Sequence, residues 1–167
     1  MQECSAAGWT VYPPGRYPYR RFDLDVVANA VASHVFARDA EDRPLPLVSI
    51  GGHYACSGRT VARWTHWVVE LTDVESLARD CIRIDPEGMP AAVGHALGIR
   101  GRAGQALAVF DRFADLLEKR GVLPRGNQPS LVRILDDQRV RHGVRFPLRN
   151  LSPPLSLGAA DTAPHGR

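Results

Sequence analysis

The side chains best suited to contact another molecule gather in one short segment, residues 49–67, which reads S-I-G-G-H-Y-A-C-S-G-R-T-V-A-R-W-T-H-W. Arg59 and Arg63 are four residues apart and His66 follows three residues later, so a helix would place all three on one face. A guanidinium group can donate two hydrogen bonds to guanine O6 and N7, and a threonine can contact a phosphate or a thymine methyl group. This chemistry fits double-stranded DNA. The candidate contact residues of the segment are Ser57, Gly58, Arg59, Thr60, Arg63 and His66.

The helix that would carry these residues has a defined start and a defined buried side. Ser57 is a good N-cap, because its hydroxyl can accept a hydrogen bond from a first-turn amide. Val61, Trp64 and Val68 recur at helical spacing and would point into the core. Residues 43–69 contain no acid, so we expect the surface of this segment to be positive. The same pattern also fits an αα-hairpin whose polar face is only solvated.

A shorter helix would precede it and complete a helix-turn-helix at residues 48–70. Such a motif needs a small residue where its helices cross, and Gly51 falls at that place. Gly51 and Gly52 together predict a short or irregular first helix, because each glycine weakens a helix by roughly 1 kcal/mol relative to alanine. Ala55 lies in the turn, where glycine would adopt a left-handed backbone more easily. Gly58 is expected to open space at the start of the second helix, whose N-terminus attracts phosphate.

The sequence of the second helix resembles a known family. Residues 57–64, S-G-R-T-V-A-R-W, are similar to the helix-turn-helix of bacterial insertion-sequence transposases, in which this helix typically reads S-x-R-T-V-x-R-W. With the looser N-terminal match, the resemblance covers roughly residues 4–70. It implies a bacterial, mobile-element-related protein whose Arg59, Thr60 and Arg63 face the major groove of DNA.

The N-terminal residues resemble the end of a zinc ribbon in related uncharacterised bacterial proteins, where C-x-x-C is followed by a Pro-Tyr-Arg-Arg segment. Cys4 matches that pattern, but Ala7 stands where the second cysteine would be. One thiolate cannot build a structural zinc site, which has four ligands, so we expect no metal and no cofactor. We interpret residues 1–22 as an irregular arm in which Arg20 and Arg21 contact the DNA backbone.

The sequence offers no catalytic site. A transposase of this lineage would also need separated carboxylates that hold two metal ions. About 100 residues follow the motif, which is too few and too helical for the usual ribonuclease-H-like domain. The chain contains no G-x-S-x-G, phosphate-loop or H-E-x-x-H motif. We therefore expect a protein that is not an enzyme.

The chain outside the motif predicts further helices. Helical spacing of apolar residues predicts a helix over residues 23–37, with Asp23 as N-cap and His34 at its core boundary. The sequence T-D-V-E predicts a capping box in which Thr72 and Glu75 begin the next helix. The dipeptide at residues 85–86 predicts another helix start, because proline is tolerated at the first helical position.

The longest predicted helix covers residues 103–120, with Gly121 just beyond its end. A short helix is predicted at residues 130–137, which closes a helical domain at residues 23–137. Residues 138–167 are basic, and from residue 152 on they are rich in Pro, Gly, Ser and Ala, so we expect a largely disordered tail. The predicted fold class is therefore mostly α: a helical bundle containing a helix-turn-helix, with an irregular N-terminal arm and a disordered C-terminal tail.

Composition limits the class of protein further. A chain of 167 residues with 44% hydrophobic content can form one domain with a sizeable core. No apolar run approaches the ~20 residues that span a bilayer, and no signal peptide is recognisable, so we expect a cytoplasmic protein. The net charge of +3 allows a nucleic-acid partner without requiring one. The preferred reading is a non-catalytic protein that binds double-stranded DNA, as a monomer or a homodimer. The alternative is a helical protein–protein interaction module that contacts its partner through residues 103–120 and binds no nucleic acid.

Overall fold

The computed structural model describes residues 22–71 and 73–142 of the chain. Within these ranges the only strand-like contact is an isolated β-bridge between Arg38 and Pro44, and the fold is mostly α, as predicted. The helices of the described residues are α1 (Leu24–Phe36), α2 (Leu47–His53), α3 (Gly58–Glu70), α4 (Val74–Ile84), α5 (Met89–Leu97), α6 (Arg102–Lys119) and α7 (Ser130–His142).

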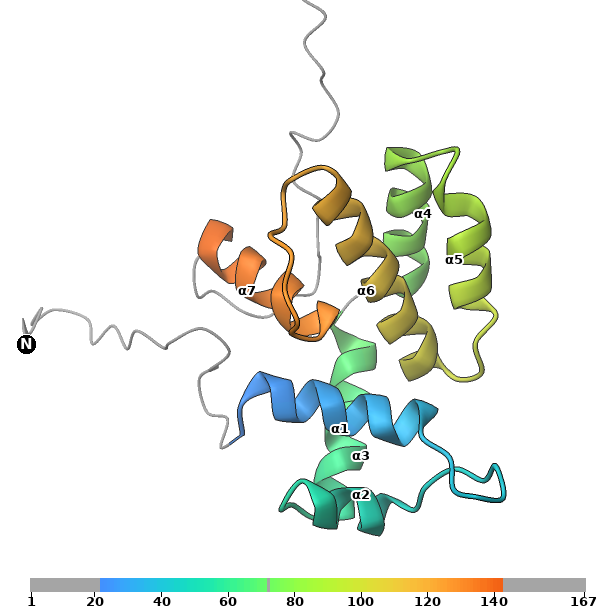
Figure 1. The fold of residues 1–167 in the computed structure, drawn as a ribbon, viewed down its shortest axis with the longest axis vertical. Coiled ribbons are helices and arrows are strands. Elements are labelled where there is room, and N and C mark those ends of the chain that lie inside the picture. The colour runs from blue at the N-terminus through green and yellow to red at the C-terminus, as the bar shows by residue number, and fades with distance from the viewer. Residues whose placement is uncertain (1–21, 72, 143–167) are drawn as a thin grey trace, which may run out of the picture.

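The helices form a bundle in which α3 and α6 join two groups (Figure 1). α1 and α2 pack with α3 at one end of the domain, while α4 and α5 pack beside α6 at the other. α3 runs from α2 past α1 toward the start of α4. α6 contacts five other helices, namely α1, α3, α4, α5 and α7. The position of α3 is therefore set by packing at both ends of the domain.

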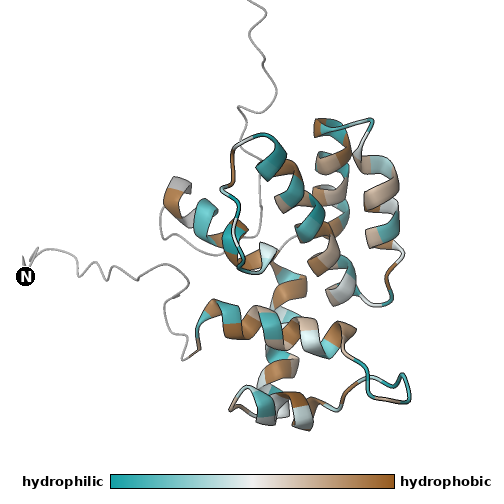
Figure 2. Ribbon diagram, in the orientation of Figure 1, coloured by the Kyte–Doolittle hydropathy of each residue, from teal (hydrophilic) through white to brown (hydrophobic). Residues whose placement is uncertain are grey.

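α6 takes the central place because apolar residues cover most of its circumference. Ten of its residues are buried, and Phe110 and Phe113 are fully inaccessible. Figure 2 shows apolar positions turned toward neighbouring helices and hydrophilic positions toward the outside. The apolar face of residues 103–120 is thus used inside the domain, which leaves the polar side of α6, with Asp111 and Lys119, for any partner.

The end of α6 follows its sequence. Gly121 has a positive φ of 68°, and its amide donates to the carbonyl of Glu118 at 2.9 Å. The amide of Val122 donates to the carbonyl of Leu117, also at 2.9 Å. These two hydrogen bonds form a Schellman motif, which satisfies carbonyls that the helix leaves unpaired. The predicted role of Gly121 is confirmed.

The predicted capping box at the start of α4 is wrong. Asp73 is the N-cap of this helix, and Thr72 lies outside the described residues. Its Oδ1 atom accepts hydrogen bonds from the amides of Glu75 at 3.1 Å and Ser76 at 3.2 Å. A carboxylate satisfies two first-turn donors here and also interacts favourably with the positive end of the helix dipole.

The predicted start of α5 is wrong as well. This helix begins at Met89, and the proline in its first turn is Pro90 rather than Pro86. The Asp85 carboxylate accepts a hydrogen bond from the amide of Gly88 at 2.8 Å. Aspartate side chains often accept a hydrogen bond from a backbone amide a few residues later in the chain, and this contact closes the turn between α4 and α5.

α7 continues to His142 and is longer than the predicted helix at residues 130–137. Gln138 is buried, with 4% of its surface exposed. The arm at residues 1–21, with Cys4, Arg20 and Arg21, lies outside the described residues, as does the tail from residue 143. Among the described helices, none has the length and apolar character that crossing a membrane requires.

Candidate nucleic-acid interface

α2 and α3 form the predicted helix-turn-helix. The turn between them spans residues 54–57, and the amide of Cys56 donates to the carbonyl of Gly51 at 2.8 Å. Gly51 lies at the closest approach of the two helices. A Cβ atom built on it would lie 2.7 Å from the Cys56 carbonyl oxygen and 2.7 Å from the Gly58 amide nitrogen. The predicted need for a small residue at Gly51 is confirmed.

Gly58 has a different role from the one expected. A Cβ atom at this position would lie 2.9 Å from the carbonyl carbon of Leu47 and 3.0 Å from its oxygen. Gly58 therefore faces the first turn of α2 and does not open space toward solvent. Its small size lets the start of α3 pack against α2, and the prediction that it leaves room for phosphate is wrong.

Ser57 caps α3 as predicted. Its Oγ atom accepts a hydrogen bond from the Thr60 amide at 3.1 Å. The two hydroxyl groups also share a hydrogen bond of 2.9 Å. Thr60 is half-buried, and its hydroxyl is partly used in this cap. Ser57 and Thr60 thus fix the start of α3, while the Thr60 methyl group and remaining hydrogen-bonding capacity are what it could offer to DNA.

The buried side of α3 anchors the helix in the core. Val61, Trp64 and Val68 are all buried, with at most 6% of their surface exposed, as their spacing predicts. The Phe22 ring lies edge-on to Trp64, with ring centroids 5.1 Å apart. Tyr54, in the turn, shares a hydrogen bond of 3.1 Å with Ser33 of α1. α3 also packs against α1, α2 and α6, so its orientation does not depend on the turn alone.

The outward side of α3 carries the candidate base contacts. Arg59 and Arg63 are exposed, and neither forms an ion pair with another described residue. They lie one helical turn apart, or about 6 Å along the helix axis. His66 is also exposed, and its Nε2 atom lies 3.4 Å from the carboxylate of Glu70. The structure thus brings the two arginines together on one face. His66 lies beside them, next to the Glu70 carboxylate.

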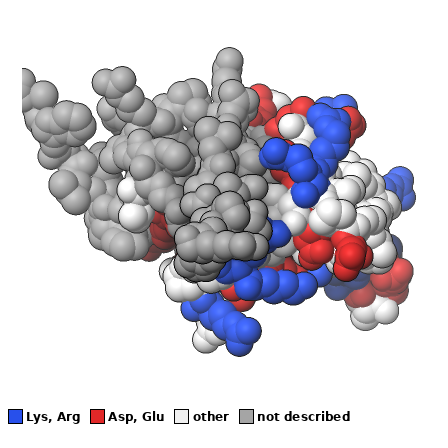
Figure 3. Space-filling model, turned by 90° about the horizontal axis from the view of Figure 1, so that it is seen from above, with Lys and Arg blue, Asp and Glu red and all other residues white. Residues whose placement is uncertain are grey.

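The segment that forms α2, the turn and most of α3 lacks acidic residues. Figure 3 looks onto the end of the domain opposite α2, where acidic and basic side chains are interspersed. Residues 43–69, which include α2, the turn and all of α3 except Glu70, contain no acidic residue. Within the described residues, no three His, Cys, Asp or Glu side chains are grouped so that they could hold a metal ion. The outward side of α3 therefore offers hydrogen-bond donors and positive charge.

Comparison with family models, curated proteins and solved structures finds no match to this chain. The likeness to transposases therefore stays a prediction from the sequence of residues 4–70. Sequence reasoning also missed Arg38, Arg100 and Arg102, which lie in a groove beside α3. The sequence I-R-G-R at residues 99–102 was the available signal, because it places two arginines around a glycine just before a long helix.

Proposed function

We propose that this protein binds double-stranded DNA without catalysing a reaction, and that α3 enters the major groove. The observation that carries the proposal is the outward face of α3, where Arg59 and Arg63 are exposed and free of ion pairs among the described residues. Arginine pairs with guanine through two hydrogen bonds, each such pair contributing about 1–3 kcal/mol of discrimination between bases. The lack of acids between residues 43 and 69 supports the proposal, because phosphate contacts supply much of the affinity for DNA.

The test begins with selection from a random duplex library at moderate salt. The parent protein should enrich a defined sequence, and its affinity for that sequence should fall steeply as salt is raised. A protein that enriches no sequence and binds no duplex would contradict the proposal and favour a protein–protein interaction module.

The second step separates recognition from general charge. Arg59→Ala with Arg63→Ala should abolish preference for the selected sequence while leaving helicity unchanged by circular dichroism. The matched control is Arg79→Ala with Arg125→Ala, which removes the same charge from exposed residues outside α3. If the α3 double variant keeps the parent's preference, the assignment of α3 as the recognition helix is wrong.

A further inference from the structure

A groove opens beside α3, where the end of α1 and the start of α6 meet it. Its volume is about 530 Å³. Five of its lining residues are basic or carry an imidazole, and none of its lining residues is acidic. These five are His34, Arg38, His66, Arg100 and Arg102. A groove with this lining attracts an anion.

The two arginines at the start of α6 are the most available cations. Arg100 and Arg102 are exposed and form no ion pair with a described residue. Arg38 is partly occupied, because its Nη1 atom donates to the carbonyls of Val35 at 3.0 Å and Ala37 at 2.9 Å. His66 lies near Glu70, as described above. Arg100 and Arg102 therefore provide most of the free positive charge of the groove.

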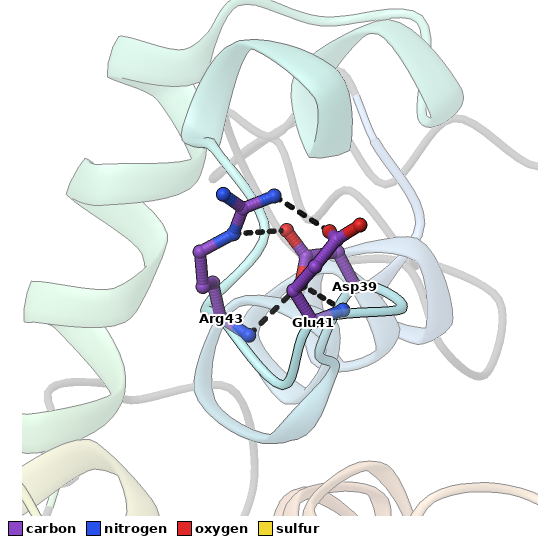
Figure 4. A network of polar contacts seen from close by, with 3 residues as sticks. All are labelled: Asp39, Glu41 and Arg43. Carbon is purple, nitrogen blue, oxygen red and sulfur yellow. Dashed lines mark hydrogen bonds and ion pairs between the residues drawn. The ribbon is translucent and has the colours of Figure 1, made fainter.

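The loop that follows Arg38 carries three acids, and two of them pair with the same arginine. Arg43 pairs with Asp39 at 2.9 Å and with Glu41 at 2.6 Å, as Figure 4 shows. The Arg43 and Glu41 amides also donate to Asp39 Oδ1, and these contacts lower the pKa of Asp39. The third acid of this loop, Asp42, does not line the groove. The loop keeps a net negative charge, but none of its acids lines the groove.

The start of α6 adds backbone donors. The N-cap, Gly101, has no side chain to cap the first-turn amides, and the first amide bonded back to it is that of Gln105, at 3.1 Å. A Cβ atom at Gly104 would lie 3.0 Å from the Val35 side chain, so a small residue is needed where α6 meets α1. Uncapped amides at a helix N-terminus carry partial positive charge and bind phosphate groups.

His34 gives a further indication of a missing partner. It lines the groove from α1, and its Nδ1 atom is buried without a hydrogen-bond partner. A buried ring nitrogen without a partner costs free energy unless a ligand or water satisfies it. The groove thus combines Arg100 and Arg102, which form no ion pair with a described residue, with uncapped amides at the start of α6.

The groove is continuous with the outward face of α3. Ala62 and His66 line the groove and also lie on the exposed side of α3, next to Arg59 and Arg63. We infer that this groove binds a phosphate of the DNA backbone, next to the bases that Arg59 and Arg63 contact. The inference rests on the proposed function, and it assigns Arg100 and Arg102 to affinity rather than to sequence preference.

The experiment compares two full-length double variants by fluorescence anisotropy on the selected duplex and on a scrambled one. Arg100→Gln with Arg102→Gln should weaken binding to both duplexes by a similar factor, roughly tenfold at 0.1 M salt. The slope of log affinity against log salt should become less steep by about 1 for each arginine that contacts a phosphate. The matched control is Arg79→Gln with Arg125→Gln, which should change the affinity and the salt slope much less. Circular dichroism and thermal unfolding confirm that each variant is folded.

The outcomes separate the two proposals. If the parent binds the duplex and the groove variant behaves like the control, the inference is wrong and the proposed function stands. If the parent binds no duplex, both are wrong. If inorganic phosphate at constant ionic strength shifts the amide NMR signals of residues 100–104, but the groove variant binds duplex like the control, the site takes a small phosphate compound and the assignment to DNA is overturned.

Discussion

Gly51 and Gly52 are neighbours in α2, and alanine at the two positions should change stability in opposite directions. A Cβ atom at Gly51 would meet three backbone atoms at 2.7–2.8 Å, namely the Cys56 oxygen, the Gly58 nitrogen and the Ser57 carbonyl carbon. None of these can rotate away as a side chain would. A Cβ atom at Gly52 would meet nothing within 4 Å, and Gly52 is exposed.

The magnitudes follow from two opposing effects. Alanine gains up to about 1 kcal/mol of helix propensity over glycine at either position. At Gly51 the clash opposes this gain, because forcing an extra carbon into a packed contact costs about 1–3 kcal/mol. We expect Gly52→Ala to be more stable than the parent by up to ~1 kcal/mol and Gly51→Ala to be less stable by up to about 2 kcal/mol.

Urea unfolding followed by circular dichroism measures both free energies of unfolding, and thermal scans provide a second readout. The two variants should differ by the cost of the clash, about 1–3 kcal/mol, which corresponds to roughly 2–12 °C in Tm for a chain of this length. Gly51→Ala should also bind the selected duplex more weakly, because α3 must move away from α2. The reasoning would be refuted if Gly51→Ala were as stable as Gly52→Ala, since the crossing of α2 and α3 would then not depend on close backbone contact.

Three further predictions concern the turn, the thiols and a carboxylate. Ala55→Gly should raise the free energy of unfolding in urea by about 1 kcal/mol, because Ala55 has a φ of 52° that glycine adopts without strain. Burial raises the pKa of Cys81 to about 12, so iodoacetamide should label Cys56 in the folded protein and Cys81 only after unfolding, as peptide mass spectrometry would show. Burial and the nearby charge of Asp136 raise the pKa of Asp25, so the ionised carboxylate destabilises the fold as pH rises through that pKa. Asp25→Asn should thus unfold at higher urea than the parent at pH 7 and lose this advantage below pH 3.8.

Local sequence predicted α3 well, because its determinants lie within a few residues of one another. Ser57 caps the helix, and Val61 and Trp64 fall on the buried side, as the pattern indicated. The need for a small residue at Gly51 was also predictable, since a helix-turn-helix fixes where its helices cross. For Gly58 the same reasoning gave a wrong role, because the sequence does not say which side of α3 meets Leu47.

Helix boundaries were less predictable where two residues compete for one role. Thr72 and Asp73 are both good N-caps, and only the backbone conformation at residue 73 decided which one bonds to the first turn. Asp85 could have begun a helix, but its carboxylate bonds to the Gly88 amide and forms a turn instead. The last turn of α7 could not be predicted from a buried apolar face, because Val140, the apolar residue in this turn, is 83% exposed.

The groove could not be predicted from local patterns, because its residues come from three helices far apart in the chain. What brings them together is close helix packing: Gly51 and Gly58 fix α3 against α2, and Gly104 lets α6 approach α1. The distance between Arg63 on α3 and Arg102 on α6 is therefore set by packed backbone rather than by flexible loops. If both arginines contact DNA, this packing holds them in position before binding, so less conformational entropy is lost when the complex forms.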